Sequence, residues 1–298
     1  MMPSSASADT PSPPAEDHWP GGLPALRAEL DRLDDAMHAL LLKRAKVVEH
    51  VARAGKRAAF RPGREASIIR RLLHNHSGSL PPQTLVRIWR ELLAGTTAMQ
   101  GQFTVAVWEP GRDAAFIQLA REHFGALTPL HAFSRPTQAI ADVAHGTAAV
   151  AVLPLPSETD NPRSAWWTGL LQQEQPRIYV VARLPFWAAP RPDGAPAAQA
   201  FVVAATAPDP SEVDRSVLGL ELDMDVSRAR FASAFAAAGL KLGPFMLRRE
   251  QGSPIAHGLA DVEGFVSDDD PRLDRLKLVQ HPPLVLGAYA VPAIGAAA

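Results

Sequence analysis

One stretch of sequence decides the fold of the N-terminal third, LRAELDRLDDAMHALLLKR at residues 26–44. Its apolar residues recur every three or four positions, a spacing that gathers side chains on one face of a helix. Neither Pro nor Gly interrupts residues 25–54. We therefore predict a single helix of about 29 residues, roughly 43 Å long, that ends at Gly55.

Two shorter helices are predicted to follow. Pro62 is placed to begin a second helix that ends before Gly78, and Pro81–Pro82 begin a third, because proline is favoured in the first turn of a helix. A helix as long as the first cannot bury its apolar stripe against two shorter ones. We therefore expect it to pair with a second copy of the chain.

Composition excludes several classes of protein. The 298 residues include 30 Lys and Arg against 31 Asp and Glu, and no Cys. Balanced charge argues against binding to nucleic acid or to an anionic membrane. The lack of cysteine excludes disulfides and thiolate nucleophiles.

Residues 1–22 are rich in Pro, Ser and Ala and predict a disordered tail. No apolar run reaches the ~20 residues of a membrane span, and we expect a soluble cytoplasmic protein.

The predicted secondary structure changes after residue 102. Strands alternate with helices over residues 103–187, which indicates an α/β domain with parallel strands. Residues 188–198 form a Pro- and Ala-rich linker, and residues 199–298 predict a small α+β domain. The predicted fold class is thus multi-domain, with an all-α domain at residues 23–102 in front of these two.

The helical segment holds the residues best suited to chemistry. Arg27 and Arg44 are 17 residues apart, about 25 Å along a helix. Arg27 and Arg44 of one chain therefore cannot grip the same small ligand. Two antiparallel copies of the helix could bring Arg27 of one chain to Arg44 of the other. Thr96 and Gln100 are four residues apart and share a face of the third helix.

Three blocks of this segment, LRAELDRLDDAMHALLLKR, RPGRE and TTAMQ, occur in order over about 80 residues. Together they resemble the all-helical class of chorismate mutase. The resemblance implies a three-helix domain in an intertwined homodimer. It also implies an isomerase that rearranges chorismate to prephenate in phenylalanine and tyrosine biosynthesis, without a cofactor, a metal or a covalent intermediate.

The resemblance also implies roles for individual residues. Arg44, Arg64 and the partner's Arg27 would bind the two substrate carboxylates. A guanidinium group suits this role because it can donate two parallel hydrogen bonds to one carboxylate. Glu65 would bind the ring hydroxyl and Gln100 the ether oxygen. Thr96 would contact a carboxylate.

One position departs from the family pattern. The family has a lysine 11 residues after the second arginine, where it donates to the ether oxygen, and this chain has Gly55 there. Lys56 follows directly and takes this catalytic role if the helix unwinds at Gly55. Otherwise Arg53 or no residue fills it. A second departure is Arg61, where some relatives carry an acidic residue.

The rest of the chain resembles a degenerate prephenate dehydratase. Residues 103–187 follow the start of that enzyme but lack its Thr-Phe-Ser and Glu-Asn-Ser elements, and one lobe is missing. Gln199 and Ala200 replace the Thr and Arg of its Thr-Arg-Phe motif. We expect no dehydratase activity. Residues from about 212 to 291 resemble a phenylalanine-sensing ACT domain whose ligand motifs have been replaced, at 226–228 and 246–249.

Two alternatives remain open. The first is a pyruvate lyase that acts on isochorismate within the same helical fold. The second is a non-catalytic subunit that regulates another enzyme of the shikimate pathway. The displaced Lys56 and the replaced motifs of the C-terminal domains favour this interpretation.

Overall fold

A computed structural model describes residues 21–54, 60–160, 165–172, 174–188, 198–250, 252–277 and 281–294. The chain divides into two compact units, Met1–Gly55 and Lys56–Ala298. Within the described residues, the first unit consists of one long helix, and the second contains five further α-helices and a large sheet. No described helix is both long enough and apolar enough to cross a bilayer.

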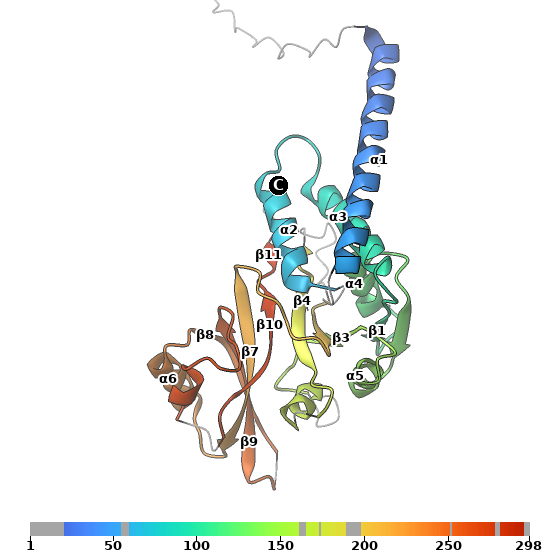
Figure 1. The fold of residues 1–298 in the computed structure, drawn as a ribbon. Coiled ribbons are helices and arrows are strands. Elements are labelled where there is room, and N and C mark those ends of the chain that lie inside the picture. The colour runs from blue at the N-terminus through green and yellow to red at the C-terminus, as the bar shows by residue number, and fades with distance from the viewer. Residues whose placement is uncertain are drawn as a thin grey trace, which may run out of the picture. The chain divides into compact units, whose positions relative to one another are not determined.

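The first unit confirms the predicted long helix. α1 runs from Gly22 to Ala54 and none of its residues is buried (Figure 1). Its apolar stripe is largely uncovered, since Leu30 is 61% and Leu40 is 65% exposed. A helix with this much exposed apolar surface fits the expectation that α1 acquires a partner.

The second and third predicted helices also form. α2 spans Pro62–His74 and α3 spans Pro82–Ala98, each with proline in its first turn. They pack together through a small apolar cluster that includes Ile69 and Leu93. Phe186 from the sheet region completes the cluster. The two helices are therefore part of the same core as the strand region that follows.

The N-terminal half of the sheet has the predicted βαβ order. Its strands β1, β2 and β3 are parallel, with β1 between the other two. Helices α4 and α5 connect them. The bounds of these elements are β1 Val105–Trp108, α4 Ala115–Phe124, β2 Leu130–Phe133, α5 Pro136–Ala144 and β3 Val150–Pro154.

Two antiparallel pairings were not predicted. β6 (Ala200–Ala204) lies between β3 and β4 (Tyr179–Leu184) and is antiparallel to both. The strand that follows the predicted linker therefore belongs to the sheet of the preceding region, and that sheet is mixed rather than wholly parallel. The division into domains at residues 198 and 199 remains a prediction.

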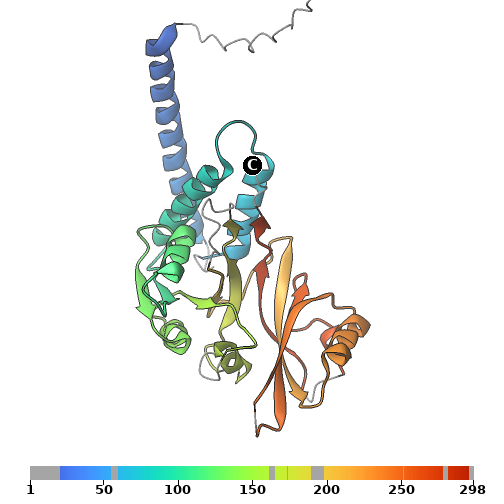
Figure 2. The same cartoon turned by 180° about the vertical axis from the view of Figure 1, so that it is seen from behind.

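The sheet continues without a break into the C-terminal region. Its nine strands have the order β2-β1-β3-β6-β4-β10-β7-β9-β8. β10 joins the halves, because it is parallel to β4 and antiparallel to β7. Helix α6 covers one face of β7–β9 (Figure 2) and packs against them. The bounds are β7 Asp214–Asp223, α6 Arg228–Ala238, β8 Leu242–Arg249, β9 Ile255–Glu263 and β10 Leu284–Ala290.

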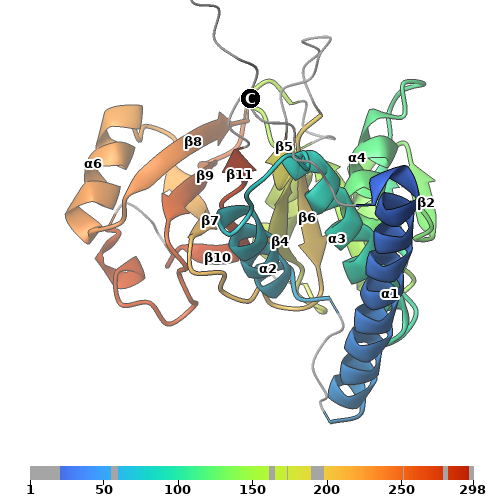
Figure 3. The same cartoon turned by 90° about the horizontal axis from the view of Figure 1, so that it is seen from above.

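Short elements complete the fold. β5 and β11 form a separate parallel pair, and two 3₁₀ helices, η1 and η2, lie in the connections. α2 lies beside β4 and β10 (Figure 3), so this helix rests on the centre of the sheet. The bounds are η1 Trp166–Gln172, β5 Trp187–Ala188, η2 Leu273–Arg275 and β11 Ala293–Ile294.

Candidate active site on the helical segment

The N-terminus of α2 is fixed by a carboxylate from the connection between β6 and β7. Asp209 accepts hydrogen bonds from the backbone N–H groups of Gly63 (3.0 Å) and Arg64 (3.2 Å). It also pairs with Arg61 at 3.2 Å. A carboxylate suits this place, because the free N–H groups and the helix dipole both favour negative charge there. Asp209 thus fixes the start of the helix that carries Arg64 and Glu65.

Glycine is required at the second position of this helix. A Cβ atom on Gly63 would lie 2.2 Å from the carbonyl oxygen of Asp209, which is far inside van der Waals contact. The backbone of α2 therefore approaches the 209–210 segment as closely as a helix can. This contact sets the position of the next two residues.

Arg64 and Glu65 point in different directions, since neighbouring residues on a helix are about 100° apart. Arg64 is exposed. The side chain of Glu65 is 13% exposed and pairs with Arg90 of α3, whose Nη1 lies 3.0 Å from its Oε2. Arg90 is itself buried, and its guanidinium lies over the ring of Phe186 at 5.4 Å. The structure therefore gives Glu65 a partner that our sequence analysis did not name.

Burial changes the acidity of Glu65. Loss of solvent raises the pKa of Glu65 to about 7, although the nearby Arg90 acts in the opposite direction. Burial likewise lowers the pKa of Arg90. A carboxyl group that titrates near neutrality exists in both protonation states at physiological pH. Glu65 can therefore either accept a hydrogen bond from a ligand hydroxyl or donate one to it.

Thr96 and Gln100 lie together at the end of α3, as their spacing predicts. The Thr96 hydroxyl donates to the carbonyl oxygens of Leu92 (2.9 Å) and Leu93 (3.0 Å). The Gln100 Nε2 donates to the carbonyl oxygen of Thr96 at 3.1 Å. An amide nitrogen has two N–H groups. The hydrogen bond to Thr96 uses one of the two N–H groups of Gln100.

The remaining predicted site residues lie elsewhere. Arg27 is exposed and Arg44 half-buried on α1, which forms its own compact unit. The joining of these arginines with α2 and α3 therefore stays a prediction. Lys56 lies outside the described residues. Among those that are described, no group of three or more His, Asp or Glu side chains could hold a metal ion.

Arg70 is a further residue that sequence reasoning missed. Its guanidinium donates to the carbonyl oxygens of Ser211 (3.0 Å), Val213 (2.9 Å) and Val291 (2.5 Å), and to the Ser211 hydroxyl at 3.0 Å. The partners lie more than 140 residues further along the chain. No local pattern could have identified them, and the same holds for the Asp209 contact.

Comparison with known proteins identifies the helical segment. Residues 26–101 match the family described as chorismate mutase type II, so this part of the chain carries a domain of that family. A bifunctional chorismate mutase/prephenate dehydratase from Pseudomonas aeruginosa is 29% identical over 46% of this chain. That share exceeds the whole stretch up to residue 101, so the similarity continues into the sheet region. The chain spans 40% of the length of this relative.

Solved structures resemble the chain more distantly. A prephenate dehydratase from Streptococcus mutans has a TM-score of 0.46 and 17% identity, covering 63% of this chain and 97% of that one. A protein described as GqqA, a novel type of quorum quenching acylase, has a TM-score of 0.48 and 20% identity, covering 65% and 96%.

Proposed function

We propose that the chain is a chorismate mutase, an isomerase that converts chorismate to prephenate at a site built by its helical segment. The observation that carries this proposal is the set of site residues inside the matched residues 26–101. The three sequence blocks hold them in the order that the family pattern requires. They are Arg27, Arg44, Arg64, Glu65, Thr96 and Gln100.

The reaction suits a site of this composition. The rearrangement is pericyclic, so it needs no nucleophile and no proton relay. The protein must hold the substrate in its compact conformer and stabilise the charge that separates as the C–O bond breaks. The exposed Arg64 is available to a substrate carboxylate. The second amide N–H of Gln100 can turn to the ether oxygen.

Glu65 would bind the ring hydroxyl of the substrate. Its pKa of about 7 supports this role, because the group can match either hydrogen-bonding direction of a hydroxyl. Arg90 then acts as a positioning residue, since it holds one oxygen of the Glu65 carboxyl group. Lys56 remains our candidate for the cation at the ether oxygen.

A homodimer would complete the site. The exposed stripe on α1 supports pairing of two such helices, because burying it removes apolar side chains such as Leu30 and Leu40 from water. In an antiparallel pair, Arg27 of one copy would enter the site of the other. The distance of about 25 Å between Arg27 and Arg44 along one helix supports a shared site.

The sheet region would have lost dehydratase activity. Ala200, which replaces the arginine of the dehydratase motif, has 0% exposure within β6 and offers no charge. Gln199, which replaces the threonine, accepts a hydrogen bond from Arg183 at 3.1 Å. The order β7-α6-β8-β9 supports an ACT-like C-terminal module.

Chorismate consumption by the purified full chain tests the mutase proposal. We expect prephenate as the product, with no pyruvate from isochorismate and no phenylpyruvate from prephenate. Arg44→Ala should lower kcat/KM by at least ~10²-fold, because a substrate carboxylate is left unpaired. Lys46→Ala, at an exposed position of the same helix, is the matched control. A folded Arg44→Ala variant with more than a third of the activity would contradict the assigned site.

A further inference from the structure

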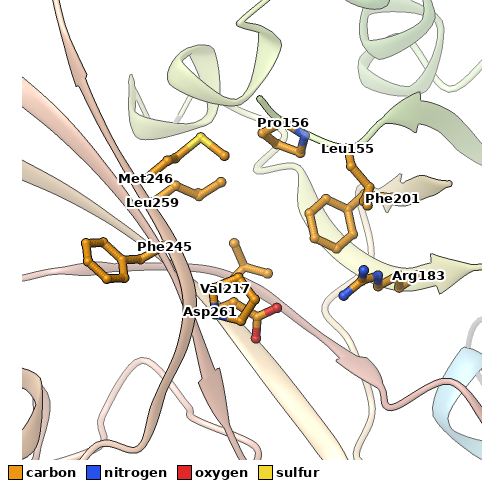
Figure 4. Close-up of a pocket in the computed structure, with 10 residues that line it drawn as sticks. Leu155, Pro156, Arg183, Phe201, Val217, Phe245, Met246, Leu259 and Asp261 are labelled. Atoms are coloured by element: carbon orange, nitrogen blue, oxygen red, sulfur yellow. The ribbon is translucent and has the colours of Figure 1, made fainter. Parts of the chain in front are cut away.

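Two cavities of the structure differ in whether their polar side chains have partners. In the cavity of Figure 4, the Asp261 carboxylate accepts a hydrogen bond from Arg215 Nε at 2.5 Å. The Arg183 guanidinium there donates to the Gln199 Oε1 at 3.1 Å. A smaller cavity of about 30 Å³ lies between α3, α4 and the segment after β4. His123 of α4 lines it, and the buried Nε2 of this imidazole has no hydrogen-bond partner among the described residues.

Arg90 lines the same small cavity and is also buried. A guanidinium carries five N–H donors. Glu65 accepts the one side-chain hydrogen bond that Arg90 donates within the described part of the chain. Phe186, a third lining residue, offers Arg90 the face of its ring. Other donors of this guanidinium therefore need an acceptor in the cavity, since buried polar groups are costly without one.

The imidazole of His123 is uncharged at neutral pH. Burial holds the pKa of His123 well below its usual range, and the positive charge of Arg90 acts in the same direction. A ring nitrogen of an uncharged imidazole either donates or accepts a hydrogen bond, so Nε2 can bind a water molecule in either tautomer. A volume of about 30 Å³ is enough for one water. One water in this cavity can accept from Arg90 and bind His123 Nε2 at the same time.

We propose that His123 is a positioning residue that, through one water molecule in this cavity, keeps the Arg90 guanidinium directed at Glu65. The inference rests on the proposed function, in which Glu65 binds the ring hydroxyl of chorismate. His123 acts on the substrate only through Arg90 and Glu65. It lies on α4, between β1 and β2 in the chain, so the α/β region contributes to the geometry of the mutase site.

Loss of the His123 imidazole has a consequence of known sign for Glu65. The exposed Glu122 also lines the cavity, so its carboxylate competes with Glu65 for the guanidinium once Arg90 is less firmly held. Besides burial, two charged groups act on Glu65: Arg90 lowers its pKa and Asp209 raises it. A looser Arg90 contact therefore raises the pKa of Glu65.

Carbon-13 NMR titration of the full chain, labelled at the glutamate carboxyl carbons, measures the Glu65 midpoint. The Glu65 resonance is the one lost in Glu65→Gln. His123→Leu removes Nε2 and should move the midpoint up by at least about 0.5 pH units. His123→Gln keeps a terminal group that can bind the water and should stay within about 0.2 pH units of the wild type. The matched control is His74→Leu, at an exposed position of α2, and it should not move the midpoint.

A double variant shows whether His123 acts through Arg90. In the Arg90→Leu background, adding His123→Leu should move the Glu65 midpoint no further. A further shift as large as that in the wild-type background overturns the proposal. If His123→Leu is unfolded by circular dichroism, Val86→Leu replaces it. This change adds one methylene group to the cavity wall, displaces the water and should raise the midpoint while His123 stays in place.

Chorismate turnover completes the test. His123→Leu should lower kcat/KM ~3-fold or more, because Glu65 is held less firmly. His123→Gln and His74→Leu should stay within ~2-fold of the wild type. An unchanged Glu65 midpoint in the folded cavity variant overturns the proposal, and so does an unchanged kcat/KM once the midpoint has moved. The titration needs no turnover, so a chain without mutase activity refutes the proposed function, while the midpoint still tests the contact of His123 with Arg90.

Discussion

Replacing Arg90 by leucine tests the packing that holds Glu65. The Arg90 side chain is 5% exposed and donates to Glu65 at 3.0 Å. Its removal leaves a carboxylate in an apolar site, which costs about 3–5 kcal/mol at a pH where the carboxylate is charged. Since Arg90 holds the pKa of Glu65 down, that pKa should rise above 7 in the variant. At pH 5 the carboxyl group is then neutral, and part of the cost disappears.

The sign of the pH dependence follows from proton binding. Folded Glu65 has a pKa of about 7 against 4.5 for the unfolded group. Between these values the folded state holds a proton that the unfolded state has lost, so the free energy of unfolding falls as the pH rises. Arg90→Leu raises the folded pKa and so extends this fall to higher pH. The cost of Arg90→Leu should therefore be larger at pH 8 than at pH 5 by about 1 kcal/mol if the folded pKa rises by one unit, and by up to about 1.4 kcal/mol if it rises further.

Urea unfolding followed by circular dichroism at the two pH values measures the effect. Arg87→Leu is the matched control, because Arg87 is an exposed arginine on the same helix, and it should change stability by less than about 0.5 kcal/mol. Adding Glu65→Gln to Arg90→Leu should recover stability at pH 8. Equal costs of Arg90→Leu at pH 5 and pH 8 would refute the reasoning.

Three further changes test other parts of the structure. Asp209→Ala removes the cap of α2 and should lower the free energy of unfolding by about 1 kcal/mol or more in urea titrations; no change would mean that water replaces the cap. Gly287→Ala should cost more than about 2 kcal/mol, because φ is +141° and its Cβ would lie 2.0 Å from a carbonyl oxygen of β4, whereas Gly95→Ala, with open space around it, should be neutral or stabilising. Mixing inactive Arg27→Ala and Arg44→Ala chains should restore one competent site per heterodimer in the chorismate assay; no recovery in verified heterodimers would contradict the shared site.

The helices could be predicted because their ends are marked in the sequence. Pro62 and Pro82 stand in the first turns of α2 and α3, and the spacing of apolar residues in between is local information. The place of β6 could not be predicted in the same way. All five of its residues are buried, so the strand shows no alternation, and its two partners are fixed only by the fold of the whole sheet.

The same distinction applies to the candidate site. Arg64, Glu65, Thr96 and Gln100 are found from motifs and from helical spacing. The Arg90 partner of Glu65 is 25 residues away on another helix. An arginine inside an amphipathic helix is usually solvent-exposed, so nothing local in the sequence distinguished Arg90 from the exposed Arg87 on the same helix.

α2 links the candidate site to the sheet region, because different faces of this helix contact different parts of the protein. Gly63 and Arg70, seven residues apart and so on one face, contact the 209–213 segment. Glu65 faces α3, and Arg64 is exposed. A helix of 13 residues is too short to be stable alone in water. The connection between β6 and β7 supplies the cap of α2 and acceptors for Arg70, so the sheet region positions two of the residues proposed to bind chorismate.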